Sequence, residues 1–252
     1  MRTEALSIDR FYQTSQGQAA RAMILRRLTA LWPDLHDLDV LAIGYGPPLL
    51  DWMGETARRS LAFMPAEQGA VRWPGEGASK TVLGDETHLP FPDSMFDRIV
   101  LVHALEESES PARLLREIWR VMAPHGRLAL VAPNRAGLWA RGEATPFGHG
   151  RPFSRGQLAG LLTDAAFTPT AWSRALYAPP WKWCCKNDRA LGWEQTGEKL
   201  WSGLGGLILA EAVKHTAALT PRRARPVRVR LPGLEGRAAP ALSPRPRLAK
   251  DD

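Results

Sequence analysis

Two glycines separated by one residue, Gly44 and Gly46, form the first feature of the sequence that could serve a ligand. They follow the short apolar run 39–43, which is typical of a tight turn between a buried strand and a helix. Such a turn lets the backbone approach a ligand closely, although a plain strand-to-helix turn also needs glycine. A dinucleotide-binding fingerprint is disfavoured, because its third glycine would stand where Leu49 is.

Two ionisable residues stand at the ends of other apolar runs. Asp85 follows the run 81–84, and His103 ends the run 96–103. His103 could act as a general base for a substrate proton, and a buried, hydrogen-bonded histidine without a catalytic role is the alternative. Asp85 could accept a hydrogen bond from a ligand, and the alternative is a solvated acid in a loop.

The periodicity of apolar residues predicts the elements that position these side chains. Strands are predicted at 39–43, 60–64, 81–85, 96–103 and 127–132, helices at 8–31, 49–59 and 111–122, and a turn into the fifth strand at 124–126. Strands that alternate with helices indicate an α/β domain with a doubly wound, mostly parallel sheet. Ligands bind at the carboxyl ends of such strands, where Gly44, Asp85 and His103 would meet.

The net charge of +7 is concentrated in one segment. Residues 221–252 contain nine basic residues, three acidic residues and six prolines, which leaves residues 1–220 nearly neutral. This composition predicts a folded domain over 1–220 and a disordered basic tail over 221–252. The tail could contact acidic lipid or RNA, and a solvated tail is the alternative.

Other classes of protein are disfavoured by composition. Cys184 and Cys185 are adjacent, so neither a disulfide framework nor a metal site with ordinary ligand spacing is expected. Residues 1–10 contain no apolar core of a signal peptide, and no apolar stretch reaches the roughly 18–20 residues that span a bilayer. We therefore expect a cytoplasmic location.

Two sequence blocks carry a resemblance to a known family. Residues 84–97, Gly-Asp-Glu-Thr-His-Leu-Pro-Phe-Pro-Asp-Ser-Met-Phe-Asp, and residues 114–126, Leu-Leu-Arg-Glu-Ile-Trp-Arg-Val-Met-Ala-Pro-His-Gly, resemble motifs of the class I S-adenosylmethionine-dependent methyltransferases (methyltransferase type 11) in order and spacing. The resemblance covers 38–132 well and extends loosely to 215. It implies a Rossmann-like, seven-stranded sheet with an antiparallel last strand, strands at 167–177 and 206–212, and an insertion at 179–204 with a helix near 188–201.

The resemblance also implies a cofactor, S-adenosyl-L-methionine, and a small-molecule acceptor. The implied cofactor contacts are Gly44, Tyr45, Gly46, Met64, Asp85, the backbone of Glu86, and Val102. Asp85 would accept a hydrogen bond from the adenine amine. Met64 stands where a carboxylate normally holds the ribose hydroxyls, and Glu67 could replace that carboxylate from a shifted loop.

Several departures from the family pattern bear on activity. Ala42 replaces the acid of the first strand, Pro48 replaces the third glycine, and Met64 replaces the ribose carboxylate. Because a charged hydrogen bond contributes about 1.5–3 kcal/mol, losing two would weaken cofactor binding by roughly 10²–10⁴-fold. An inactive, methyltransferase-like interaction protein is thus the alternative. A nucleic-acid or membrane-surface binder acting through the tail is a further one, disfavoured by the nearly neutral domain.

Three residues are candidates for an acceptor site. Tyr12 could close over the cofactor from the N-terminal segment, while Trp139 and His149 belong to the glycine-rich loop 134–153. For all three, packing or a surface position is the alternative. Residues 178–186 interleave aromatic residues with lysines, and could line an acceptor site or rest against a membrane interface. A loop pinned to the core by its tryptophans is the other interpretation.

Overall fold

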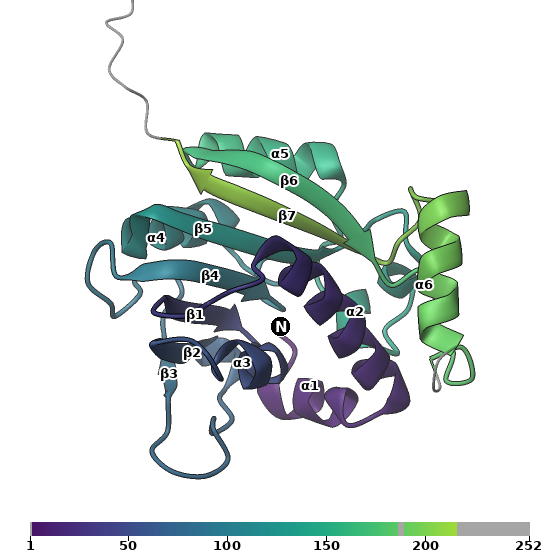
Figure 1. The fold of residues 1–252 in the computed structure, drawn as a ribbon, viewed down its shortest axis with the longest axis horizontal. Helices are drawn as coiled ribbons and strands as arrows, with labels where there is room; N and C mark the ends of the chain where they lie inside the picture. Colours follow the sequence, from purple (N-terminus) through teal and green to yellow (C-terminus); the bar gives the residue numbers. More distant parts are fainter. Residues whose placement is uncertain (1, 186–188, 216–252) are drawn as a thin grey trace, which may run out of the picture. The chain divides into compact units, whose positions relative to one another are not determined.

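The computed structural model describes residues 2–185 and 189–215, so the predicted tail 221–252 lies outside the described residues. A seven-stranded sheet forms its centre, in the order β3-β2-β1-β4-β5-β7-β6 (Figure 1). The strands are β1 (Asp39–Gly44), β2 (Arg59–Pro65), β3 (Thr81–Gly84), β4 (Phe96–Val102), β5 (Met122–Pro133), β6 (Phe167–Ala175) and β7 (Leu207–Lys214). Neighbouring strands from β3 to β5 run parallel, and β7 is antiparallel to both β5 and β6. The predicted doubly wound sheet with an antiparallel last strand is confirmed.

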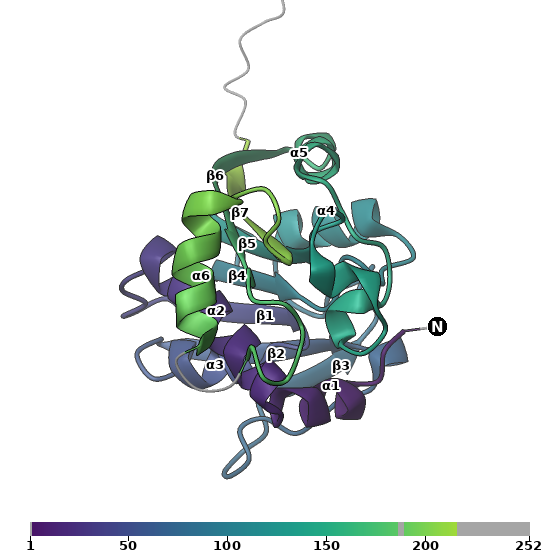
Figure 2. The same cartoon turned by 90° about the vertical axis from the view of Figure 1, so that its right-hand side faces the viewer.

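Helices cover both faces of this sheet, with α2, α3 and α6 on one side and α4 and α5 on the other (Figure 2). The helices are α1 (Ala5–Tyr12), α2 (Ser15–Leu31), α3 (Pro47–Met53), α4 (Pro111–Val121), α5 (Arg155–Asp164) and α6 (Arg189–Leu200), with short 3₁₀ turns η1 (Ala66–Gln68), η2 (Leu138–Arg141) and η3 (Pro146–Gly148). In β1, Val40 and Ala42 join one hydrophobic cluster, and Leu41 and Ile43 join the other. Alternate side chains of a strand point to opposite faces, so a strand buried on both faces is continuously apolar.

The prediction of one helix over 8–31 is wrong, because the chain turns between two helices there. Thr14 stands at this turn and accepts a hydrogen bond from the backbone N–H of Gly17 at 3.1 Å. Threonine is a favoured helix N-cap, so a new helix begins at Ser15. Gly17 is required at the crossing, since a Cβ atom on it would lie 2.1 Å from the carbonyl oxygen of Phe11.

Two further boundaries differ from the prediction. The helix predicted over 49–59 ends at Met53, because Arg59 pairs with Asp39 in the parallel ladder of β1 and β2. The adjacent Arg58 forms an ion pair with Asp39 at 2.7 Å, which holds this stretch beside the sheet. The turn predicted at 124–126 lies inside β5, where the pairing with β4 shifts register.

Helix α5 was absent from the sequence prediction, although its start carries a recognisable signal. Ser154 accepts a hydrogen bond from the backbone N–H of Gln157, and the Gln157 side chain accepts one from the N–H of Ser154. This reciprocal pair is the capping box, which the spacing Ser-x-x-Gln encodes. No helix in the part of the chain described here is long and apolar enough to span a membrane.

Arg120 joins the two sequence blocks that carry the family resemblance. Its guanidinium donates to the carbonyl oxygens of Leu89 at 2.8 Å and Phe91 at 2.9 Å, and to the Glu117 carboxylate at 2.8 Å. Glu117 in turn accepts a hydrogen bond from the N–H of Leu89 at 2.9 Å. The Arg and Glu of α4 therefore hold the Leu-Pro-Phe loop in place, and their role is structural.

We predict that Arg120→Ala lowers the free energy of unfolding by about 2–3 kcal/mol, because it removes charged hydrogen bonds to two backbone carbonyls. Urea denaturation of the full chain measures this loss. Arg116→Ala is the matched control, since Arg116 is an exposed arginine of the same helix. Equal stabilities of the two variants would contradict the assignment.

Candidate functional site

The glycine turn after β1 lies against the end of β4. Gly44 has φ = 89°, and a Cβ atom on it would lie 2.0 Å from the carbonyl oxygen of Val102. The N–H of Tyr45 donates to that same oxygen at 3.1 Å. A Cβ atom on Gly46 would lie 2.3 Å from Cβ of Ala42. The packing of the chain against itself thus accounts for both glycines, and it also accounts for the small residue at position 42.

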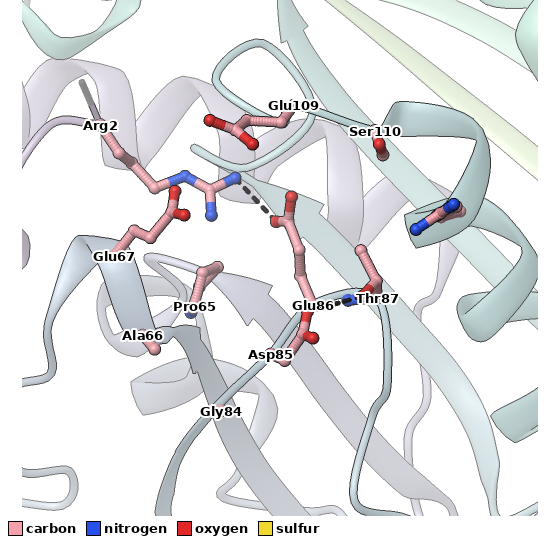
Figure 3. A pocket seen from close by; sticks show the side chains of 11 residues that line it. Arg2, Pro65, Ala66, Glu67, Gly84, Asp85, Glu86, Thr87, Glu109 and Ser110 are labelled. Atoms are coloured by element: carbon pink, nitrogen blue, oxygen red, sulfur yellow. Dashed lines mark hydrogen bonds and ion pairs between the residues drawn. The ribbon is translucent and has the colours of Figure 1, made fainter.

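A cleft of about 320 Å³ opens at the carboxyl ends of β2 and β3, beside the start of α4 (Figure 3). Its charged lining consists of Arg2, Glu67, Asp85, Glu86, Glu109 and Arg113. Carboxylates outnumber guanidinium groups there, so the cleft favours a ligand that is cationic or rich in hydrogen-bond donors. Hydrogen bonds from the Thr87 backbone and hydroxyl lower the pKa of Asp85, which keeps this carboxylate ionised at neutral pH.

The three candidate residues around this cleft have different positions. Met64 is fully buried, and its sulfur accepts the N–H of Val71 at 3.4 Å, so it does not line the cleft. Glu67 lines the cleft on the side opposite Asp85 (Figure 3). The side chain of Glu86 is buried and engaged by Arg2 at 2.7 Å, which leaves its backbone as the part adjacent to Asp85.

Residues 2–12, which we call the N-terminal strap, lie across this edge of the sheet. Arg2 binds Glu86 and donates to the carbonyl oxygen of Ala104 at 3.2 Å. The N–H of Thr3 donates to the Glu107 carboxylate at 2.8 Å. These contacts join the strap to the loops after β3 and β4, and sequence analysis did not find them.

Helix α1 of the strap brings Tyr12 against His103. The Tyr12 hydroxyl lies 2.9 Å from Nε2 of His103, and the Tyr12 ring stacks on Tyr45 at 5.9 Å between centroids. From the other side, the Gln68 amide donates to the carbonyl oxygen of His103 at 3.1 Å. All four residues are almost fully buried. Their side chains therefore fill the middle of the edge, between the ends of β1, β2 and β4.

Buried polar atoms without partners surround the histidine. Glu106 is 2% exposed, with Oε1 lying 3.9 Å from Nδ1 of His103 and Oε2 unpartnered within the described residues. Oε1 of Gln68, whose amide nitrogen donates to the His103 carbonyl oxygen, also lacks a partner there. Such atoms mark positions where water or a ligand group completes the hydrogen bonding. Sequence analysis missed Glu106, although its place three residues after His103 was a usable signal.

Burial changes the proton affinity of both groups. Desolvation lowers the pKa of His103 to about 3, so the ring is neutral at physiological pH. Desolvation raises the pKa of Glu106 to about 8. Glu106 can therefore hold or release a proton near neutral pH beside a neutral imidazole, as acid–base chemistry requires.

The side chains of the remaining acceptor candidates have partners other than this pair. Trp139 is 1% exposed and donates to the carbonyl oxygen of Ala178 at 2.7 Å, so it is a core side chain. His149 lines a separate groove of about 380 Å³ together with Phe11 and Lys182. Among the described residues there is no cluster of three or more side chains suited to hold a metal ion.

Comparisons with known proteins support the family suggested by the two sequence blocks. A family model described as a methyltransferase domain matches residues 38–130. A probable S-adenosylmethionine-dependent methyltransferase of Mycobacterium tuberculosis (strain CDC 1551 / Oshkosh) is 33% identical over 93 residues, covering 36% of this chain and 34% of the relative. A demethylmenaquinone methyltransferase of Mycolicibacterium paratuberculosis (strain ATCC BAA-968 / K-10) is 34% identical over 99 residues, covering 36% and 43%. The chain thus spans less than half of the length of either relative.

The fold is found in solved structures as well. The crystal structure of a SAM-dependent methyltransferase from Archaeoglobus fulgidus matches with a TM-score of 0.57 at 19% identity, covering 83% of this chain and 98% of that one. At this identity the likeness concerns the fold alone. The family model covers β1 to β4 and most of β5, the part that carries the glycine turn and most of the cleft.

Proposed function

Because the chain belongs to the class I S-adenosylmethionine-dependent methyltransferase family, we propose that it transfers a methyl group from S-adenosylmethionine to a small-molecule acceptor. One observation carries the proposal: the acid-lined cleft at the ends of β2 and β3 lies where a doubly wound sheet binds its ligand. Its volume, about 320 Å³, is at the lower end of small-molecule pockets, which measure roughly 300–1,000 Å³.

The residues of the cleft fit the nucleoside part of this cofactor. Asp85 supplies an ionised hydrogen-bond acceptor for the adenine amine. Glu67 supplies a carboxylate for the ribose hydroxyl groups, because Met64, at the usual position of that carboxylate, has no oxygen to bind them. The adjoining space towards the glycine turn contains Tyr12 and Gln68. We infer that the N-terminal strap withdraws from this space when the cofactor enters, and that the unpartnered oxygens of Gln68 and Glu106 then acquire partners.

The bound cofactor supplies an activated methyl group on a sulfonium centre, so the protein needs chiefly to align the reactants and to exclude water. Phe147 packs on the His103 ring and provides an apolar wall that excludes water from it. The proton of the acceptor passes to Nε2 of His103 as Nδ1 gives its own proton to the Glu106 carboxylate, whose Oε1 lies 3.9 Å away, so that no buried imidazolium has to persist. The pair thus accepts one proton in each turnover.

Calorimetric titration with S-adenosylhomocysteine tests the proposal. The wild-type chain is expected to bind, and Asp85→Asn and Glu67→Gln are each expected to weaken binding roughly tenfold or more, because each removes a charged hydrogen-bond acceptor. Glu55→Gln is the matched control, since Glu55 is an exposed acid outside the cleft. Absence of binding at millimolar ligand would refute the proposal.

A second candidate is an inactive member of the family that serves as an interaction protein. The observation that favours it is the filled middle of the edge, where Tyr12, Tyr45 and Gln68 pack on His103. Under this alternative the strap stays closed, and a folded wild-type chain gives no heat with S-adenosylhomocysteine. The same titration therefore separates the two functions.

A further inference from the structure

Most of the exposed large hydrophobic side chains lie in two stretches of the chain. Ten such residues are exposed among the described ones, and seven of them belong to η2 and to residues 181–204. These seven are Leu138, Trp181, Trp183, Leu191, Leu200, Trp201 and Leu204. Figure 2 shows the side of the molecule on which α6 lies. Large exposed apolar patches mark interaction sites on soluble domains.

The segment 179–185, which we call the tryptophan loop, is anchored by residues other than its tryptophans. Cys184 and Cys185 are buried, and the Gln16 side chain donates to the carbonyl oxygen of Pro180 at 2.8 Å. In contrast, Trp181 and Trp183 are 55% and 56% exposed. The interpretation that tryptophans pin this loop to the core is therefore wrong.

The two tryptophans stack on each other at the surface. Their ring centroids are 6.0 Å apart with an interplanar angle of 16°. Two indoles that pack together outside the core present a continuous aromatic surface. Tryptophan is enriched at membrane interfaces because its ring combines an apolar body with a polar end.

The surroundings of the loop combine apolar grooves with basic groups. An apolar groove of about 290 Å³ between η2 and α6 contains Trp193 and Leu204, with Arg141 among its lining residues. Lys182 stands between the stacked tryptophans in sequence and lines the groove of about 380 Å³, where two basic residues, Lys182 and Arg10, face one acid, Glu143. This mixture of aromatic and basic side chains is complementary to anionic lipid headgroups over acyl chains.

We propose that the tryptophan loop docks this face of the protein on an anionic lipid bilayer. Trp181 and Trp183 enter the interface between headgroups and acyl chains, and Lys182 contacts the headgroup phosphates. A second copy of the chain is a poorer occupant, because a two-fold contact through the tryptophan pair would bring Lys182 close to its own copy. Docking would also place the groove of about 380 Å³, which α1 and Lys182 line, at the membrane surface, where an amphiphilic methyl acceptor could enter it. This last consequence alone rests on the proposed function.

Vesicle co-sedimentation of the full chain without cofactor tests the docking. Vesicles of phosphatidylglycerol and phosphatidylcholine in equal parts are compared with vesicles of phosphatidylcholine alone. The wild-type chain is expected to bind the anionic vesicles. Trp181→Ala and Trp183→Ala are each expected to weaken partitioning by about tenfold, since each removes a large apolar side chain that docking would bury in the bilayer. Lys182→Gln is expected to weaken binding to the anionic vesicles only.

Trp119→Ala is the matched control, because Trp119 is a partly exposed tryptophan on α4, on the other face of the sheet. All variants keep residues 216–252, so any contribution of the basic segment is the same in each. Equal binding of the wild type and of the double variant at Trp181 and Trp183 would overturn the proposal, as would failure of the wild type to bind. Loss of self-association in the double variant, without vesicle binding by the wild type, would assign the surface to a second copy. Because no cofactor is present, failure here leaves the titration with S-adenosylhomocysteine unaffected.

Discussion

Gly44→Ala is expected to lower the free energy of unfolding by about 3–5 kcal/mol and to abolish binding of S-adenosylhomocysteine. The residue has φ = 89°, in the left-handed region that costs a non-glycine residue roughly 1–3 kcal/mol. Its new Cβ atom would also lie 2.0 Å from the carbonyl oxygen of Val102, and overpacking of this kind costs a further 1–3 kcal/mol or so. Because that oxygen belongs to the backbone of a central strand, the clash cannot be relieved by rotating a side chain.

Chemical denaturation measures the stability, and calorimetry measures binding at a temperature where the variant is folded. Gly75→Ala is the control, since a Cβ atom on Gly75 would meet no atom within 4 Å. We expect this control to differ little from the wild type. A Gly44→Ala variant with wild-type stability would show that the turn relaxes, and would contradict the close approach of β1 to β4.

Arg2→Met is the second substitution with a large expected effect. The guanidinium is buried and binds Glu86 at 2.7 Å, so its removal leaves a buried carboxylate whose one remaining side-chain partner among the described residues is the Ser108 hydroxyl. Breaking a buried ion pair by deleting one partner costs about 3–5 kcal/mol. The loss should fall mainly on the N-terminal strap, because Arg2 is its first anchor.

Hydrogen exchange resolved by segment distinguishes a local effect from a global one. In Arg2→Met, the amides of α1 are expected to exchange faster while those of β4 stay protected. Arg10→Met provides the control, as Arg10 is an exposed arginine on the same strap. Unchanged exchange in α1 would mean that the ion pair does not hold the strap.

The sheet was predictable because its signals are local. The apolar run of β1, the turn at Gly44 and the two sequence blocks each lie within a short window, and they fix strand order through the family they resemble. Asp85 was found for the same reason, since an acid at a strand end needs no knowledge of distant residues. Its neighbour Glu86 shows the limit, because its partner Arg2 lies 84 residues earlier in the chain.

The interior of the site was not predictable in this way. Tyr12 reaches His103 only because Thr14 caps a second helix, which turns α1 across the edge of the sheet. Gln68 reaches the same histidine from the end of β2. Both contacts join segments that are far apart in the sequence, and no local pattern of apolar residues predicts which of these segments pack together. Similarly, Trp139 is chemically suited to bind an acceptor, but packing places it in the core.

The most direct test of the account is hydrogen exchange of the full chain with and without S-adenosylhomocysteine. We propose that the cofactor lies over the ends of β1, β2 and β3. We therefore expect the ligand to slow exchange at residues 44–46, 66–69 and 84–87. Exchange at α6, none of whose residues lines the cleft, should not change. Saturating ligand that leaves all three of these segments unprotected would contradict the claim that this edge holds the cofactor.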